Sequence, residues 1–152
     1  MHTLERILTT VGSVITICFG VWHFFVPKIW NWYSHIAPEA TELVAAVRAI
    51  NVFFSLCLVV FGVVNILFIN GNKANKYAIV TILSATSILW LTRTIMQLVY
   101  PQGSMNPAIQ YGMLAVFVLV TLCFLIPLCI VITEWIWNWS IQKLYLACIT
   151  QL

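Results

Sequence analysis

The chain has 152 residues, of which 62% are hydrophobic and only 7% are charged, and its formal net charge is +3. An ordinary soluble domain carries about 25% charged residues, so this composition excludes a water-soluble globular protein. The few basic residues are scattered and form no cluster of the kind that nucleic-acid binding requires, which excludes nucleic acid as a partner.

Four long apolar runs predict an all-α fold, an integral membrane four-helix bundle with short loops. The runs cover about residues 7–26, 43–69, 77–100 and 112–133. Apolar segments of about 18 or more residues are typical of helices that span a lipid bilayer. Because the four runs occupy most of the chain, we expect residues 1–152 to form a single transmembrane domain.

The first run ends in an aromatic segment, GVWHFFVPKIWNWYSH, which covers residues 20–35. This run is too long for the hydrophobic part of a signal peptide and is not followed by a small-residue cleavage signal, so we expect it to be retained as the first helix. Pro27 lacks a backbone donor and should break the helix. Trp30, Trp32 and Tyr33 are expected in the headgroup layer, which amphipathic rings prefer.

Small and polar residues recur every three or four positions along the first three helices. Residues at this spacing share one helix face, and small residues let helices approach closely in lipid. We therefore expect three stripes to face the interior of the bundle. They consist of Gly12, Thr16, Gly20, His23 and Pro27 on the first helix, Arg48, Asn51, Ser55, Gly62 and Asn65 on the second, and Thr86, Trp90, Arg93 and Gln97 on the third.

The strongest polar groups of these stripes are expected in one layer of the outer half of the bundle. Counting from the outer helix ends at 1.5 Å per residue places His23, Arg48 and Arg93 roughly 6–11 Å inside. An intramembrane arginine costs about 2.5–3.5 kcal/mol and generally finds an interior partner, yet no Asp or Glu lies at this level. Guanidinium binds phosphate, carboxylate or quinone oxygens. The sequence predicts a ligand-binding site formed by His23, Arg48, Asn51, Arg93 and Gln97, for an anionic lipid or a quinone-like amphiphile.

A purely structural interpretation of the same residues, without a ligand, stays open. Arg48 is near enough to the surface to extend toward the headgroups. Arg93 and Gln97 would then only join helices by hydrogen bonds, and the stripes would serve packing within one chain or within a homo-oligomer.

Metal and haem sites are not predicted. The five cysteines show no paired CxxC spacing, and His23 is the only histidine inside an apolar run. A zinc site needs several ligands in close spacing, and haem in a helical bundle is usually held by facing histidines, although a single axial ligand stays open. The sequence identifies no cofactor and no catalytic residue.

The distribution of basic residues predicts the orientation of the helices. Arg6, Lys73, Lys76 and Lys143 would share one side of the membrane and Lys28 would lie on the other. Basic residues in short loops mark the cytoplasmic side, so both termini are expected on the cytoplasmic side of a bacterial-type cell membrane. Residues 134–152 follow as an interfacial helix or as an extension of the fourth helix, and the sequence leaves both open.

The segments GVWHFFVPKIWNW and LWLTRTIMQLVY resemble small four-helix integral membrane proteins of the DoxX-like kind. The resemblance covers most of the chain by topology, and the matching residues are His23, Pro27, Arg93 and Gln97. Some DoxX-like proteins are associated with quinone-linked sulfur oxidation or membrane redox complexes. The resemblance therefore implies a redox accessory role, although the chain lacks a paired-cysteine motif for thiol chemistry.

Three functions follow as hypotheses. The chain binds an anionic or quinone-like amphiphile, or it is an enzyme or redox subunit with His23 as acid–base group, or it is a structural protein whose stripes only pack helices or subunits. A cavity at His23 and Arg93 favours the first, whereas buried and mutually hydrogen-bonded side chains without a cavity favour the third.

Overall fold

The computed structural model describes residues 3–71, 74–103 and 106–149, with side chains described as far as Lys143. Within these ranges the chain is all-helical, and four of its helices are long and apolar enough to cross a membrane. The all-α fold expected from the sequence is confirmed in this part of the chain. The elements are α1 (Thr3–His23), α2 (Val26–Ile29), the 3-10 helix η1 (Trp32–His35), α3 (Thr41–Asn70), α4 (Lys76–Val99) and α5 (Pro107–Ile149).

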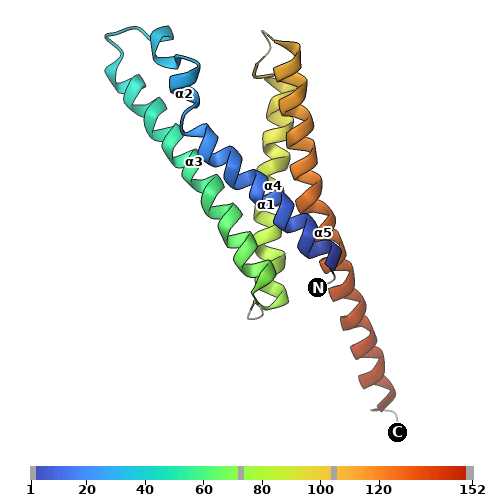
Figure 1. The fold of residues 1–152 in the computed structure, drawn as a ribbon. Coiled ribbons are helices and arrows are strands. Elements are labelled where there is room, and N and C mark those ends of the chain that lie inside the picture. The colour runs from blue at the N-terminus through green and yellow to red at the C-terminus, as the bar shows by residue number, and fades with distance from the viewer. Residues whose placement is uncertain (1–2, 72–73, 104–105, 150–152) are drawn as a thin grey trace.

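The long helices form two pairs that meet at an angle. α1 packs mainly against α3, and α4 packs mainly against α5. The two pairs cross where the first half of α1 reaches α5, and they separate toward α2 and the α4–α5 turn (Figure 1). This separation leaves the N-terminal end of α3 and the C-terminal end of α4 less covered than the opposite ends of these helices (Figure 1).

The observed helix ends agree closely with the apolar runs for α3 and α4, whose bounds lie within two residues of 43–69 and 77–100. α1 differs, because it begins at Thr3 and ends at His23. The chain then turns and starts the short α2, in which Pro27 occupies one of the first positions. A proline is tolerated there because its missing N–H has no partner in the first helical turn.

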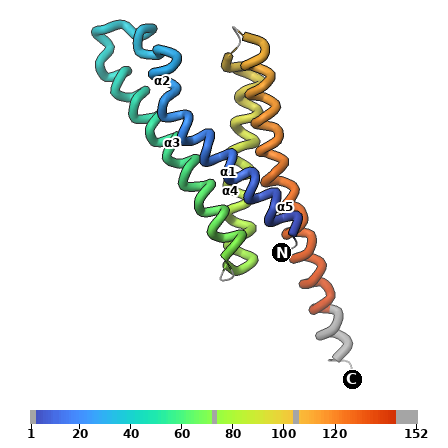
Figure 2. Tube along the Cα trace, viewed as in Figure 1, coloured from blue at the N-terminus to red at the C-terminus, as the bar shows by residue number. Residues whose placement is uncertain are grey.

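α5 is the longest helix, with 43 residues. At 1.5 Å per residue it is about 64 Å long, roughly twice the hydrocarbon thickness of a bilayer. Its C-terminal part extends beyond the other helices (Figure 2). Residues 134–149 therefore continue the fourth helix without a break, and residues 150–152 lie outside the described part of the chain.

Burial on α3 shows the pattern expected for a helix in lipid, with polar residues inside and apolar residues outside. Ile50 and Phe53 are 68% and 69% exposed, whereas Asn65 is fully buried. The predicted stripes are confirmed at most positions by burial. The buried members are Gly12, Thr16, Gly20 and Pro27, then Asn51, Ser55, Gly62 and Asn65, then Thr86, Trp90 and Gln97.

Buried polar pairs join the helices along these stripes. Trp90 Nε1 donates to Thr16 Oγ1 at 3.1 Å and connects α4 to α1. Asn65 Nδ2 donates to Thr86 Oγ1 at 2.7 Å and connects α3 to α4. Hydrogen bonds between membrane helices contribute about 0.6 kcal/mol on average, so these pairs fix which faces meet more than they add to stability.

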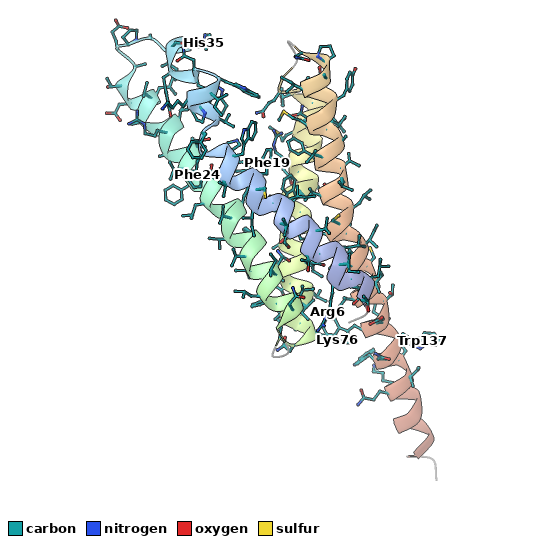
Figure 3. The ribbon with its side chains drawn as sticks, in the orientation of Figure 1. Arg6, Phe19, Phe24, His35, Lys76 and Trp137 are labelled. Carbon is teal, nitrogen blue, oxygen red and sulfur yellow. The ribbon has the colours of Figure 1, made fainter. Side chains whose placement is uncertain are left out.

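The two ends of the bundle differ in their side chains. Arg6 and Lys76 lie at one end, and His35 lies at the opposite end, beyond α2 (Figure 3). Near the separation of the pairs, the Phe19 ring packs edge-on against Phe117 with a centroid distance of 5.4 Å. Aromatic packing therefore closes the crossing point directly below the space where the pairs diverge.

Candidate ligand-binding cavity

A cavity of about 470 Å³ lies between α1, α3 and α4, toward the end of the bundle that carries η1. This volume falls within the range of small-molecule sites, about 300–1,000 Å³. Its wall is mostly apolar and aromatic. It consists of His23 from α1, Trp32 from η1, Val47, Ile50, Asn51 and Phe54 from α3, Arg93 and Met96 from α4, and Tyr100 and Gln102 from the segment that follows.

Arg93 provides the charge of this cavity. Its Nη2 donates to Gln102 Oε1 at 2.6 Å, and its guanidinium carbon lies 4.4 Å from the centre of the Phe117 ring. A guanidinium has five N–H donors, and this is its one hydrogen bond to a described residue. No carboxylate is among the described lining residues. The cavity therefore contains a cation whose remaining N–H donors make no hydrogen bond to a described residue.

His23 is held in place by side chains of α3. Its Nδ1 lies 3.3 Å from Ser55 Oγ, and the Ser55 hydroxyl donates its hydrogen to Asn51 O at 2.7 Å. Because a serine has only one hydroxyl hydrogen, Nδ1 of the neutral ring is the donor to Ser55. Nε2 is then the acceptor nitrogen. The Phe54 ring packs edge-on against the imidazole at 4.8 Å.

Asn51 lines the cavity and carries an unsatisfied acceptor that is itself buried. The residue is 6% exposed, and it lies on the same cavity wall as His23 and Arg93. Its Oδ1 nevertheless makes no hydrogen bond to any described residue. Leaving a buried acceptor unpaired costs about 1–3 kcal/mol, so this position is one weak point in the packing beside the cavity.

Gln97 holds one part of the cavity wall in place through a hydrogen bond to Gln102. Its Nε2 donates to the backbone oxygen of Gln102 at 2.9 Å, and the residue is buried. Gln97 does not line the cavity itself. It fixes the segment after α4 in the position from which the Gln102 side chain accepts the hydrogen bond of Arg93.

The structure places Arg48 outside the cavity, which differs from the expectation that it faces the bundle interior. The residue is exposed, and its guanidinium carbon lies 5.5 Å from the centre of the Tyr33 ring. Arg48 therefore lies beside η1 and not in the space between the helix pairs. Of the five predicted site residues, His23, Asn51 and Arg93 line one cavity, Gln97 supports it, and Arg48 lies apart.

Four polar or aromatic members of the wall were not predicted as site residues: Trp32, Phe54, Tyr100 and Gln102. Trp32 was assigned to the headgroup layer, and its ring lies 6.4 Å from that of His23. Gln102 lies in an uncharged loop and carries no motif. The short distance along the chain from Arg93 to this turn was the only signal that could have suggested Gln102.

The fold and the cavity define a class of protein: a small helical protein with four helices that are long and apolar enough to cross a membrane, and an arginine in a cavity between its helix pairs. Comparison of the chain with protein-family models, curated proteins and solved structures found no match. The resemblance to DoxX-like proteins therefore stays a prediction.

Proposed function

We propose that this chain is an integral membrane protein that binds a small amphiphile, with the head group of the amphiphile in the cavity and one of its oxygens on Arg93. The observation that carries the proposal is the Arg93 guanidinium on a largely apolar wall, with one hydrogen bond to a described residue. A buried cation is costly without a partner. An oxygen-bearing head group supplies that partner.

The other polar groups restrict the chemistry of the head group. Arg93 offers donors, whereas His23 Nε2 is an acceptor. A matching head group therefore carries an acceptor oxygen for the arginine and a hydroxyl that donates to His23 Nε2. A quinol and a singly protonated phosphate ester share this chemistry, and both fit the anionic or quinone-like amphiphile expected from the sequence.

The orientation of the protein in the membrane is part of the proposal. Arg6 and Lys76 lie at the end of the bundle opposite His35 (Figure 3). Basic residues mark the cytoplasmic side, which supports a cytoplasmic location for the end with Arg6 and Lys76. Both termini would then be cytoplasmic in a bacterial-type cell membrane. The cavity would lie in the outer half of the bilayer.

The purely structural alternative is less well supported. It requires His23 and Arg93 to be locked by hydrogen bonds in a filled interface. Instead, His23 pairs with Ser55 and Arg93 with Gln102, and a cavity lies beside both residues.

Titration calorimetry of the purified protein in dodecyl maltoside micelles tests the proposal, with decyl hydroquinone under reducing conditions and decyl phosphate as the two probes. Arg93→Met keeps the apolar length of the side chain and removes its charge and donors. A hydrogen bond to a charged group contributes about 1.5–3 kcal/mol, so we expect binding to weaken about tenfold to a hundredfold. Arg93→Lys should recover only part of the lost affinity, because a lysine ammonium lacks the planar guanidinium that forms two parallel hydrogen bonds.

Arg48→Met is the matched control, since Arg48 lies toward the same end of the bundle and outside the cavity. We expect it to bind as the unmodified chain does. Arg93-dependent binding of the hydroquinone alone identifies a quinone-type ligand, and that of the phosphate alone identifies an acidic lipid. Binding of neither probe, or equal losses from Arg48→Met and Arg93→Met, contradicts the proposal.

A further inference from the structure

A second hollow adjoins the cavity on the side where α3 and α4 face each other. Its volume is about 460 Å³, and it shares Phe54, Arg93 and Met96 with the cavity. The remaining wall is formed by Ala85, Ile88, Leu89 and Thr92, all from α4. We call this hollow the α3–α4 groove.

The groove leads away from the polar end of the cavity. Ala85 precedes Arg93 by eight positions on α4, so the groove extends about 12 Å along the helix toward the bilayer centre. Apart from Arg93 and the small Thr92, the lining residues carry no polar side chain. The two hollows together have polar groups at one end and apolar side chains along the rest, which is the layout of an amphiphile.

The groove is open to the surrounding lipid. Ile88 on its wall is 65% exposed, and each of the two facing helices has its main packing partner elsewhere, α3 with α1 and α4 with α5. Phe54 lines both hollows and packs against His23, so it lies at the junction between them. A ligand can therefore reach the cavity sideways between α3 and α4.

We infer that the α3–α4 groove holds the apolar tail of the amphiphile whose head group occupies the cavity, and that the ligand enters from the bilayer by this route. The inference rests on the proposed function and adds the class of ligand: a membrane-resident amphiphile with an extended hydrocarbon or isoprenoid tail. It excludes a compact water-soluble anion. Lipid is already as apolar as the groove wall, so moving the tail from lipid into the groove gains no hydrophobic free energy. The tail is held there by van der Waals packing against the wall.

A groove-filling substitution tests the inference with probes of two tail lengths. Ala85→Phe places a ring in the groove and leaves the cavity wall unchanged. We expect it to weaken binding of the decyl probe about tenfold, since inserting bulk into an occupied apolar site is costly, and to leave binding of the matching ethyl probe unchanged. The decyl and ethyl probes carry the same head group, the one that binds in the Arg93 experiment. Comparing variant with unmodified chain for each probe cancels the partition of that probe into micelles.

Ala115→Phe is the matched control, because Ala115 is exposed on α5 and lines neither hollow. It should change neither affinity. If Ala85→Phe fails to fold, Thr92→Phe fills the groove from an exposed position and carries the same expectation.

The outcomes separate this inference from the proposed function. Equal binding of the decyl probe by Ala85→Phe and the unmodified chain, with Arg93→Met still weakening both probes, overturns the groove assignment and leaves the cavity proposal intact. Loss of Arg93 dependence for both probes overturns the proposed function itself. A change in subunit number with Ala85→Phe in native mass spectrometry, with both affinities unchanged, would assign the groove to a second copy of the chain and overturn the inference.

Discussion

Gly62 lies where α3 crosses α1, and the structure leaves no room there for a methyl group. A Cβ at this position would lie 2.5 Å from Ile17 Cγ1 and 2.9 Å from the backbone oxygen of Ser13. The Ser13 oxygen belongs to the backbone of α1 and cannot turn away. Gly62→Ala therefore forces the two helices apart at their contact.

The size of the effect follows from two opposing terms. Overpacking a well-packed contact costs about 1–3 kcal/mol, while replacing a helical glycine by alanine gains about 1 kcal/mol of helix propensity. The net destabilisation by Gly62→Ala is thus about 0–2 kcal/mol. Gly112→Ala on α5 has the propensity gain alone, because a Cβ there meets no atom within 4 Å. The two variants should differ by about 1–3 kcal/mol.

Unfolding by sodium dodecyl sulfate in mixed micelles, followed by circular dichroism, measures this difference as a free energy of unfolding. We expect Gly112→Ala to be at least as stable as the unmodified chain and Gly62→Ala to be less stable than Gly112→Ala. Equal stability of the two alanine variants would refute the close contact between α1 and α3.

Three related predictions use the same preparations. Gly20→Ala, whose Cβ would lie 2.9 Å from a backbone oxygen of α3, should be about 1–3 kcal/mol less stable than Gly112→Ala in the unfolding assay, and equal stability would count against the contact. Trp90→Phe removes a buried hydrogen bond to α1 and should lower the unfolding free energy by about 1 kcal/mol, whereas Trp22→Phe at an exposed position should change it less. Gln97→Ala releases the backbone of the segment after α4 and should weaken probe binding in calorimetry by a few fold, less than Arg93→Met does; a larger loss would give Gln97 a direct role.

The sequence predicted the helices and their inner faces well because both follow from local patterns. The lengths of α3 and α4 are set by apolar runs with polar residues at each end, and the burial of Asn51 and Asn65 follows from helical spacing. α1 was less well predicted at its C-terminal end. The apolar run extends to residue 26, but Pro27 cannot bond to the carbonyl of His23, four residues earlier, and α1 ends at that residue.

Arg48 shows why the candidate site was only partly predictable. It precedes Asn51 by three positions and should share its face, yet Asn51 is buried and Arg48 is exposed. Helical spacing gives the direction of a side chain, but it does not say how far a neighbouring helix continues alongside. The angle between the helix pairs decides this, and that angle depends on contacts between distant parts of the chain, such as that of Gly12 on α1 with Cys123 and Phe124 on α5.

Gln102 was missed for a similar reason. Its role depends on the turn after α4, in which the backbone is held by Gln97 and the side chain meets Arg93. Neither contact has a sequence signature, because each joins a helix to a loop whose path is set by the whole bundle.

The central claim is that Arg93 holds an oxygen of an amphiphile in the cavity between α1, α3 and α4. An experimental structure of the protein in lipid nanodiscs, prepared with whichever decyl probe binds, tests it most directly. We predict density for the head group in the cavity, with an oxygen about 3 Å from the Arg93 guanidinium. A structure in which the cavity is closed and Arg93 turns away toward lipid would contradict the claim.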